Sequence, residues 1–498
     1  MSDAASAESI VIESSPDQTA GVFRAEYAPG RSSIEFLAAL ILGVVVFRLF
    51  VAEAYIVPTG SMAPTLMGLH RELTCSNCKK SFAVGMDEQG RSARPLCPNC
   101  GSSTIDDALT VDRNGDRLLV QKYLYDLRKP RRWEVAVFQN PGDPSQAYVK
   151  RIVGLPGESI RIHEGDVYID GRIAQKNLVE QRATRQLVFD NDYVPADSDR
   201  YPRWTFRSGN RGGVQGPSGW RAEDSRFFRE PEVSAADRID WLEYRHWDPE
   251  RAAYGPVRDF CGYNGGEARR INRVNDLMVE ADVAVGPGIE SLSIRFRTHG
   301  DWLTVTLPTD PSTPCEVRRA GRIVWTSGSR TKGLPVSAVA SWRSVRLEAS
   351  VIDRCLTLAI DGSPIFPPLD LSEMSSAGDF GASASPIALG VLGEGAARIS
   401  GLKIYRDVYY TDDISGGARR PFAVDEPYEL GPGEYFVLGD NSPVSNDSRF
   451  WPKSPVVPEA LLVGKPFLVH LPSRGMPLKV FGGETYWVPD PREIRYID

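Results

Sequence analysis

The sequence predicts a mainly β protein with an N-terminal transmembrane helix, an inserted four-cysteine zinc ribbon and an inserted β-sandwich of the jelly-roll type. Three observations lead to this fold class: an uncharged apolar run near the N-terminus, two closely spaced cysteine pairs, and many short stretches in which apolar and polar residues alternate. The chain has 498 residues, which is enough for about three domains that each bury a core.

The composition excludes several classes of protein. Charged residues make up 25% and hydrophobic residues 42% of the chain, so a disordered, collagenous or polytopic membrane protein is excluded. The net charge of -7 argues against nucleic acid as a partner, because binding phosphates requires a basic surface. There are five histidines and no HExxH pair, so we expect no cofactor for catalysis.

The first predicted element is a membrane anchor. Residues 36–47 carry no charge, and apolar character resumes after Arg48. A helix over this region approaches the ~20 residues that cross a bilayer, so we predict an anchor at residues 34–55 after a tail at residues 1–33. Arg24 and Arg31 precede the run and residues 56–70 contain no Lys or Arg, which places the tail in the cytoplasm.

Ala52-Glu53-Ala54 resembles the processing site of a cleavable signal peptide, which is the alternative interpretation of the apolar run. The residues before the run are polar and partly acidic, whereas a signal peptide begins with a short basic segment. An uncleaved anchor is therefore favoured. The same tripeptide is also a possible substrate for a neighbouring copy of the chain.

The second predicted element is a zinc ribbon inserted at residues 73–103. Two Cys-x-x-Cys pairs lie 18 residues apart, and each pair can close half of a tetrahedral zinc site. Two disulfides are the alternative, because thiols outside the cytoplasm tend to oxidise. The predicted zinc ligands are Cys75, Cys78, Cys97 and Cys100.

Alternating strands follow the ribbon and return near the C-terminus. Strand patterns occur at Arg117–Leu124, Glu134–Gln139 and Ser159–Ile173, and another at Glu434–Leu438 after about 260 residues of different character. The intervening residues 181–270 have no assigned role, although Ala235–Trp247 hints at a short helix.

Many short strands with Asp-Gly and Ala-Gly turns over residues 271–410 predict a β-sandwich. The pattern around residues 354–362 and 402–405 resembles concanavalin A/laminin-G-like jelly rolls. Such a sandwich could bind a glycan or a peptide, and an inert spacer is an equal alternative.

Ser61 is the candidate nucleophile. It follows Gly60 in a turn that Pro58 and Pro64 stiffen on either side, so its hydroxyl is presented on a constrained loop. Any serine in a tight loop looks similar, and a serine nucleophile also requires a base. No histidine lies in a motif-like segment, so the base must be another residue.

Lys150 is the candidate base, because it lies among Val149, Ile152 and Val153 on a predicted strand. Burial can lower the pKa of a lysine by ~3 to 5 units, which leaves a neutral amine near pH 7 that can accept the serine proton. The alternative is an ordinary strand lysine whose amine reaches water, and Lys122 is expected to be one.

Four segments together resemble the bacterial type I signal peptidases, or leader peptidases, which use a Ser-Lys dyad. They are Pro58–Thr65, Gly115-Asp116 with the following strand, Tyr148–Gly157 and Gly439–Arg449, in the family's order behind an apolar N-terminal run. The resemblance implies an all-β catalytic core at residues 56–72, 110–176 and 427–470, with a C-terminal tail at 471–498. The zinc ribbon and the jelly roll are insertions into this core.

The resemblance also implies residue roles by position. Ser61 matches the nucleophile and Lys150 the general base, while the Thr59 hydroxyl joins the Ser61 backbone N–H in the oxyanion hole. Ser445 matches the serine that orients the lysine. The remaining supporting residues are an ion pair of Asp447 with Arg449, and Asp440 with Asn441 in the same motif.

The implied function is removal of signal peptides from exported preproteins after small-residue sites. The expected partners are preprotein signal peptides, membrane lipid and the protein translocation machinery, and the expected location is the bacterial cytoplasmic membrane with the catalytic domain outside. Two alternatives remain. One is a membrane-tethered binding module with a degenerate protease core, whose jelly roll recognises a surface polymer. The other is self-cleavage, as in repressors that share the dyad.

Overall fold

The structure is a computed structural model, and it divides into two compact units, Met1–Val51 and Ala52–Asp498. The second unit is built mainly of β-strands, which confirms the predicted mainly β class. The structure describes residues 29–46, 52–210, 215–216, 218–231, 238–265, 271–298, 301–327, 334, 339, 341–372, 384–412, 421–471, 475–479, 485–489, 491 and 494–497.

The first unit contains helix α1 (Pro29–Val46), and several of its apolar side chains are exposed, including Ile34, Phe36 and Leu42. Among the described residues, no helix combines the length and the apolar character needed to cross a membrane. The anchor predicted at residues 34–55 is therefore not established. Residues 1–28 and 47–51 lie outside the described part of the chain.

The C-terminal end of the predicted anchor is a strand rather than a helix. Strand β1 (Ala52–Ile56) pairs antiparallel with β5 (Arg117–Gln121), with Ala52 opposite Gln121 and Ile56 opposite Arg117. The side of β1 that faces β5 is thus paired in this sheet, which corrects the predicted helix boundary.

The sheet around the candidate site has the strand order β1-β5-β33-β6-β7-β31-β32, and β36 pairs with β33. Strands from the two ends of the chain alternate in it, so the long insertion leaves and returns within one sheet. The new strands are β6 (Val135–Asn140), β7 (Asp143–Gly154), β31 (Glu434–Leu438), β32 (Val457–Pro458), β33 (Leu462–Leu471) and β36 (Arg495–Tyr496).

Smaller elements complete this core. A second sheet has the order β10-β9-β8-β30. The residues predicted as a C-terminal tail include β36 and a hairpin of β34 and β35, so their described parts are structured, because β33 and the hairpin partner supply hydrogen bonds. The elements are α2 (Leu124–Leu127), β8 (Ser159–His163), β9 (Asp166–Ile169), β10 (Arg172–Ile173), β30 (Tyr428–Glu429), η7 (Glu459–Leu461), β34 (Gly475–Lys479) and β35 (Thr485–Pro489).

The four-cysteine segment forms a compact subdomain on a three-stranded sheet of order β3-β2-β4. Its strands are β2 (His70–Thr74), β3 (Ser81–Gly85) and β4 (Val111–Arg113), with the single turn η3 (Asp107–Leu109) before β4. The four cysteines pack with Leu73, Phe82 and Val84 in one buried cluster.

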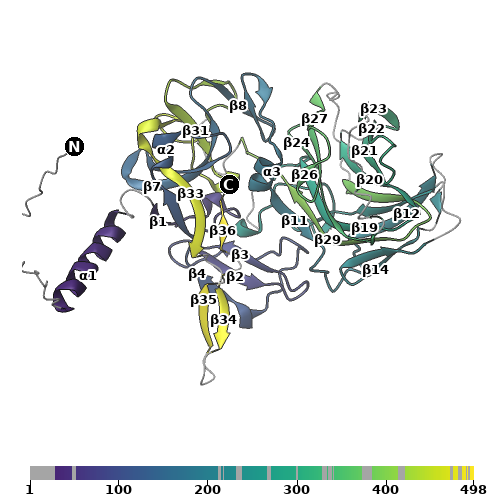
Figure 1. The fold of residues 1–498 in the computed structure, drawn as a ribbon, viewed down its shortest axis with the longest axis horizontal. Helices are drawn as coiled ribbons and strands as arrows, with labels where there is room; N and C mark the ends of the chain where they lie inside the picture. The colour runs from purple at the N-terminus through teal and green to yellow at the C-terminus, as the bar shows by residue number, and fades with distance from the viewer. Residues whose placement is uncertain are drawn as a thin grey trace, which may run out of the picture. The chain divides into compact units, whose positions relative to one another are not determined.

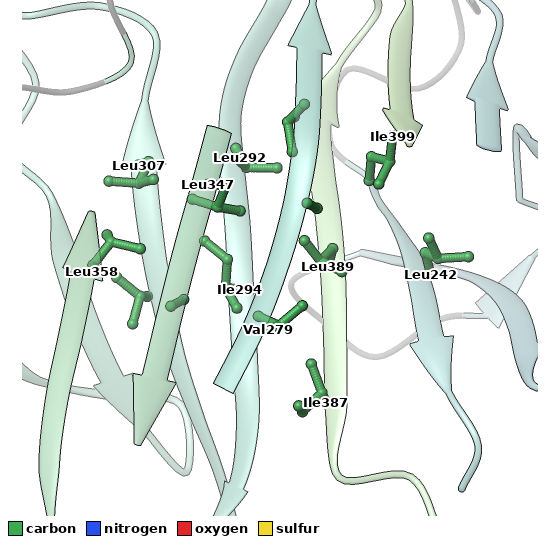
Figure 2. Packing of buried hydrophobic residues seen from close by; sticks show 14 of the residues in the cluster. Leu242, Val279, Leu292, Ile294, Leu307, Leu347, Leu358, Ile387, Leu389 and Ile399 are labelled. Atoms are coloured by element: carbon green, nitrogen blue, oxygen red, sulfur yellow. The ribbon is translucent and has the colours of Figure 1, made fainter. Parts of the chain in front are cut away.

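Two large antiparallel sheets form a β-sandwich (Figure 1). One sheet has the order β14-β15-β29-β19-β24-β25-β26, with β11 beside β29 and β27 beside β25, and the other has the order β13-β12-β16-β28-β20-β21-β22-β23. Figure 2 shows Val279 and Leu347 of the first sheet packed near Ile294 and Leu389 of the second, within one large buried cluster. This arrangement supports the sandwich-like part of the prediction.

The sandwich begins before the predicted boundary at residue 271. Six strands from residues 181–270, β13 among them, join its sheets. Most of the described part of the predicted helix at 235–247 is β16, because β12 and β28 pair with it on both sides. The region at residues 181–270, to which the sequence assigned no role beyond a connection, is therefore largely sandwich. Besides β13, its strands in these sheets are β11 (Gln186–Asp190), β12 (Trp204–Asn210), β14 (Trp220–Glu223), β15 (Arg226–Arg229) and β16 (Arg238–Tyr244).

The remaining elements of this region have the following bounds: α3 (Leu178–Thr184), β13 (Gln215–Gly216), β17 (Trp247–Asp248), β18 (Ala253–Tyr254), η4 (Gly262–Asn264), β19 (Leu277–Val285), β20 (Ile289–Thr298), β21 (Asp301–Pro308), β22 (Glu316–Arg319), β23 (Arg322–Thr326), β24 (Val345–Ile352), β25 (Cys355–Ile360), β26 (Ser363–Pro364), β27 (Leu369–Asp370), β28 (Ile387–Gly393) and β29 (Ala397–Arg406). The turn η4 leaves the sandwich and, as shown below, reaches the candidate active site.

Candidate active site

Ser61 lies in the single helical turn η2 (Gly60–Met62), which follows β1. The turn is closed by a hydrogen bond from Ala63 N to Gly60 O of 3.0 Å, and the Ser61 carbonyl accepts a hydrogen bond from Asn441 N at 3.0 Å. The loop that contains Ser61 is therefore held by a hydrogen bond within the loop and by a hydrogen bond from the motif at residues 439–449.

The Gly115-Asp116 motif also supports the loop that contains Ser61. A Cβ at Gly115 would lie 1.7 Å from Val57 O, so only glycine allows the two backbones to pass. The Asp116 carboxylate accepts a hydrogen bond from Met67 N at 3.0 Å, and Asp116 O accepts one from Val57 N at 2.9 Å. This motif holds both ends of the Ser61 loop.

Lys150 lies on β7 with 4% of its surface exposed, and its Nζ is 2.6 Å from Ser61 Oγ. Burial is the main cause that lowers the pKa of Lys150, from its usual 10.5 to about 8, with Arg449 acting in the same direction and Asp447 and Asp440 opposing it. A neutral amine at this position can accept the proton of the Ser61 hydroxyl. The structure thus brings together the two residues that the sequence analysis assigned to the dyad.

Thr59 lies beside the nucleophile. Its hydroxyl is 3.4 Å from Ser61 Oγ and the residue is exposed. This location is compatible with a donor next to the reacting carbonyl, and the predicted contribution to an oxyanion hole stays a prediction.

Ser445 is fully buried beside the site, but its hydroxyl has no hydrogen-bond partner among the described residues. The side chain packs against Gly439, where an added Cβ would lie 2.2 Å from Ser445 Oγ and 2.5 Å from Ser61 O. The predicted contact from Ser445 to Lys150 is not formed in this structure, and its orienting role stays a prediction.

Asp447 and Arg449 form the predicted ion pair. Arg449 donates to both carboxylate oxygens of Asp447, at 2.9 and 2.7 Å, and both side chains are fully buried. Arg449 also donates to Thr411 O at 2.6 Å and to Ser442 Oγ at 2.7 Å, while Gly439 N donates to Asp447 at 3.0 Å. The pair fixes the loop that contains the turn η6 (Ser442–Val444).

Asp440 forms a second buried ion pair, and its partner Arg151 was missed by the sequence analysis. Arg151 donates to the two carboxylate oxygens of Asp440 at 2.8 and 2.6 Å, and both side chains are fully buried. Thr65 Oγ1 also donates to Asp440, at 2.6 Å. The only signal in the sequence was that Arg151 follows Lys150 on a predicted strand. Because successive side chains of a strand point to opposite faces, Arg151 is expected on the face opposite Lys150.

A cleft of about 620 Å³ opens in front of the dyad. Strands β1, β5, β6 and β7 supply apolar walls, including Tyr55, Leu118, Val137 and Val149, and the dyad lies among them. Tyr263, from the turn η4 of the insertion, also lines the cleft. The shape suits an extended apolar chain lying beside a strand.

The four predicted zinc ligands lie together in the ribbon. Their sulfur atoms are within 4.8 Å of one another, with 3.5 Å between Cys75 and Cys100 and 3.6 Å between Cys78 and Cys97. Tetrahedral zinc with Zn–S bonds of ~2.3 Å places sulfurs about 3.8 Å apart. No pair among these four cysteines is joined by a disulfide, and their donor set and spacing fit zinc.

A cluster of three carboxylates, separate from the dyad, was not predicted from the sequence. Carboxylates of Asp166, Asp276 and Asp353 lie within 4.8 Å of one another, and burial raises the pKa of Asp276 to about 7 and that of Asp353 to about 6. Lys176 donates to Asp353 at 2.9 Å and to Asp407 at 2.8 Å. The ammonium group of Lys176 thus already balances part of the negative charge of these carboxylates.

The model of the signal peptidase family, peptidase S26, matches residues 107–228 and 407–471. The probable signal peptidase I-2 of Synechocystis is 38% identical over 16% of this chain and 37% of its own length, and the signal peptidase I of Leptolyngbya laminosa is 28% identical over 34% and 62%. The signal peptidase I of Pseudomonas aeruginosa is 28% identical over 24% and 51%.

The chain thus spans about half the length of the curated relatives it matches. In these segments it is similar to signal peptidases, and this supports the hydrolase expected from the motifs. Among solved structures, the carbohydrate-binding module CBM66 of Bacillus subtilis is matched at 8% identity over 41% of this chain and 94% of that one, with a TM-score of 0.23, which is too low to establish a shared fold.

The buried ion pair gives a prediction on stability. Asp447→Asn leaves the Arg449 guanidinium without its buried countercharge, so we expect the free energy of unfolding to fall by roughly 3 kcal/mol or more, measured by denaturant unfolding. Asp87→Asn is the control, because its ion pair with Arg91 is at the surface and no measurable change is expected. Equal effects of the two substitutions would contradict this account.

Proposed function

We propose that the chain is a type I signal peptidase, a membrane-anchored serine endopeptidase that removes signal peptides from exported preproteins. The observation that carries the proposal is the 2.6 Å contact between Lys150 Nζ and Ser61 Oγ in a buried site. The similarity of residues 107–228 and 407–471 to the signal peptidase family supports it. A degenerate protease core would have no reason to keep this contact.

The proposed mechanism is acyl transfer. Neutral Lys150 removes the Ser61 proton, and Ser61 Oγ attacks the scissile carbonyl carbon. The Thr59 hydroxyl and the Ser61 N–H stabilise the oxyanion, each donor contributing on the order of 3 kcal/mol. The protonated lysine then gives its proton to the leaving amine, and water activated by the same lysine hydrolyses the acyl-enzyme.

The substrate is proposed to bind as an extended strand with small side chains before the scissile bond, as in A-x-A-like sites. The cleft between Tyr55 of β1 and Val149 of β7 supports this mode, because β1 is the outermost strand of its sheet and leaves an edge for pairing. Exposed apolar side chains on α1 and the positions of Arg24 and Arg31 support a membrane attachment with the catalytic unit outside the cytoplasm. The proposed partners are membrane lipid and the translocation machinery.

The ribbon is proposed to bind one structural zinc ion through Cys75, Cys78, Cys97 and Cys100. Zinc would supply folding energy rather than chemistry, because all four coordination positions are filled by protein thiolates.

Substitution of the dyad tests the proposed function. Ser61→Ala removes the nucleophile and Lys150→Ala the base, so each is expected to lower the rate of preprotein processing on the order of 10⁴-fold or more. Lys122→Ala is the matched control, because this lysine is partly exposed and bonds Glu53 at 3.2 Å. Retained processing in either dyad variant would rule out the mechanism.

The activity is expected to depend on pH through Lys150. The amine is a base only when neutral, and its pKa is lowered to about 8. We therefore expect kcat/KM to increase as the pH is raised through about 8, and to be low at pH values below about 8. The measurement is the pH profile of cleavage of a preprotein peptide. A profile that is flat from about pH 6 to about pH 10 would contradict the role of Lys150 as the base.

The zinc proposal predicts about one zinc ion per chain in the purified protein by elemental analysis. Cys97→Ser should abolish the bound zinc and lower the thermal unfolding midpoint, because metal binding contributes folding energy. Cys315→Ser is the control. This buried cysteine lies in the sandwich core, so its substitution should leave the bound zinc in place. Two disulfides and no metal would be the contrary result.

A further inference from the structure

The turn η4 (Gly262–Asn264) reaches the Ser61 loop although it belongs to the insertion. Residues 229–406 lie between the two segments that match the signal peptidase family, so η4 lies outside the matched core. Nevertheless Asn264 is 6% exposed and contacts the motif that holds Ser61. A residue outside the matched segments thus contributes a side chain to the surroundings of Ser61.

Asn264 and Asn441 form a reciprocal amide pair. Asn264 Nδ2 donates to Asn441 Oδ1 at 2.7 Å, and Asn441 Nδ2 donates to Asn264 Oδ1 at 2.8 Å. The second N–H of the Asn441 amide donates to Gly60 O at 2.8 Å, and the Asn441 backbone N–H donates to Ser61 O at 3.0 Å. Both amide hydrogens of Asn441 and its oxygen therefore have partners.

The pair and the Gly60 carbonyl together determine which way the Asn441 amide points. An isolated Asn side chain can turn over and exchange its oxygen and nitrogen. With Asn264 present, the Asn441 oxygen faces a donor and its nitrogen faces Gly60 O. A reversed amide would place two oxygens together at Gly60 and lose the hydrogen bond next to the nucleophile.

We propose that Asn264 of the inserted segment is a positioning residue for the reaction, because it fixes the Asn441 amide that holds the Gly60-Ser61 backbone. This inference rests on the proposed peptidase function. Asn264 acts through Asn441 and need not touch the substrate. A displaced Ser61 carries its hydroxyl away from Lys150, so the effect falls on the chemical step.

The packing around η4 supports this role. A Cβ at Gly60 would lie 2.1 Å from the Tyr263 ring, so the nucleophile loop lies directly against this ring. The Tyr263 hydroxyl donates to Leu69 O at 2.8 Å. On its other side η4 contacts the ribbon, where a Cβ at Gly262 would lie 3.1 Å from Pro98. The turn is thus fixed on both sides and holds Asn264 in place.

The test compares Asn264→Ala and Asn264→Asp with the unsubstituted full-length chain in detergent, acting on a preprotein with an Ala-x-Ala site. The aspartate substitution keeps the size of the side chain, but a carboxylate cannot donate to Asn441 Oδ1. We expect kcat to fall on the order of 10- to 100-fold in both variants, with KM nearly unchanged. The aspartate variant also carries the test if the alanine variant fails to fold.

Asn191→Ala is the matched control. Asn191 is a buried asparagine that follows β11 in the sandwich, and it donates to Ser225 O at 2.8 Å and accepts from Trp204 Nε1 at 2.9 Å. Its removal should lower the thermal unfolding midpoint without lowering kcat. If the unsubstituted chain cleaves preprotein and the Asn264 variants keep its kcat, this inference fails alone. If the unsubstituted chain cleaves no preprotein, the proposed function fails first.

Discussion

The candidate site depends on lowering the pKa of one buried lysine, Lys150, from its usual 10.5 to about 8. An ammonium group in this location would be stabilised by any unpaired carboxylate nearby, and Asp440 and Asp447 are both close enough to raise the pKa of Lys150. Each of these carboxylates is instead held by its own arginine, Asp440 by Arg151 and Asp447 by Arg449, through two charge-assisted hydrogen bonds. Because the acids are already neutralised, desolvation outweighs their attraction. The two ion pairs are thus a condition for the base as well as for the fold of the loop.

The sheet explains how residues far apart in the sequence meet at this point. Strand β31 pairs antiparallel with β7, with Leu438 opposite Arg151. The chain therefore leaves β31 beside Lys150, and the following Gly439 and Asp440 lie next to the dyad. The turn η2 reaches the same place from β1, and Asn441 bonds its backbone. An insertion between β10 and β30 leaves this register unchanged, which is why the core tolerates it.

The Asp447–Arg449 pair was implied only by the resemblance to the signal peptidases. Local signals in the sequence predicted Ser61, Lys150 and the four cysteines as candidates, because Pro, Gly and Cys spacing and strand alternation are properties of short segments. They could not predict Asn264 or the partner of Asp440, which depend on contacts between segments more than 170 residues apart. The same reason applies to β16, where pairing with two neighbouring strands overrides a local helical pattern. The predicted helix boundary at Ala52 was wrong, because residues 52–56 form a strand that pairs with β5.

The insertions are connected to the catalytic core by packing and not only by sequence. Ala63 of the nucleophile loop, Ala83 of the ribbon, and Cys261 and Tyr263 of the η4 region form one buried cluster. The second cysteine knuckle contributes to the same contact, because Pro98 packs against Gly262. The order of this knuckle is therefore coupled by packing to the order of the turn that carries Asn264. The ribbon and the turn η4 therefore pack together against the loop that contains Ser61.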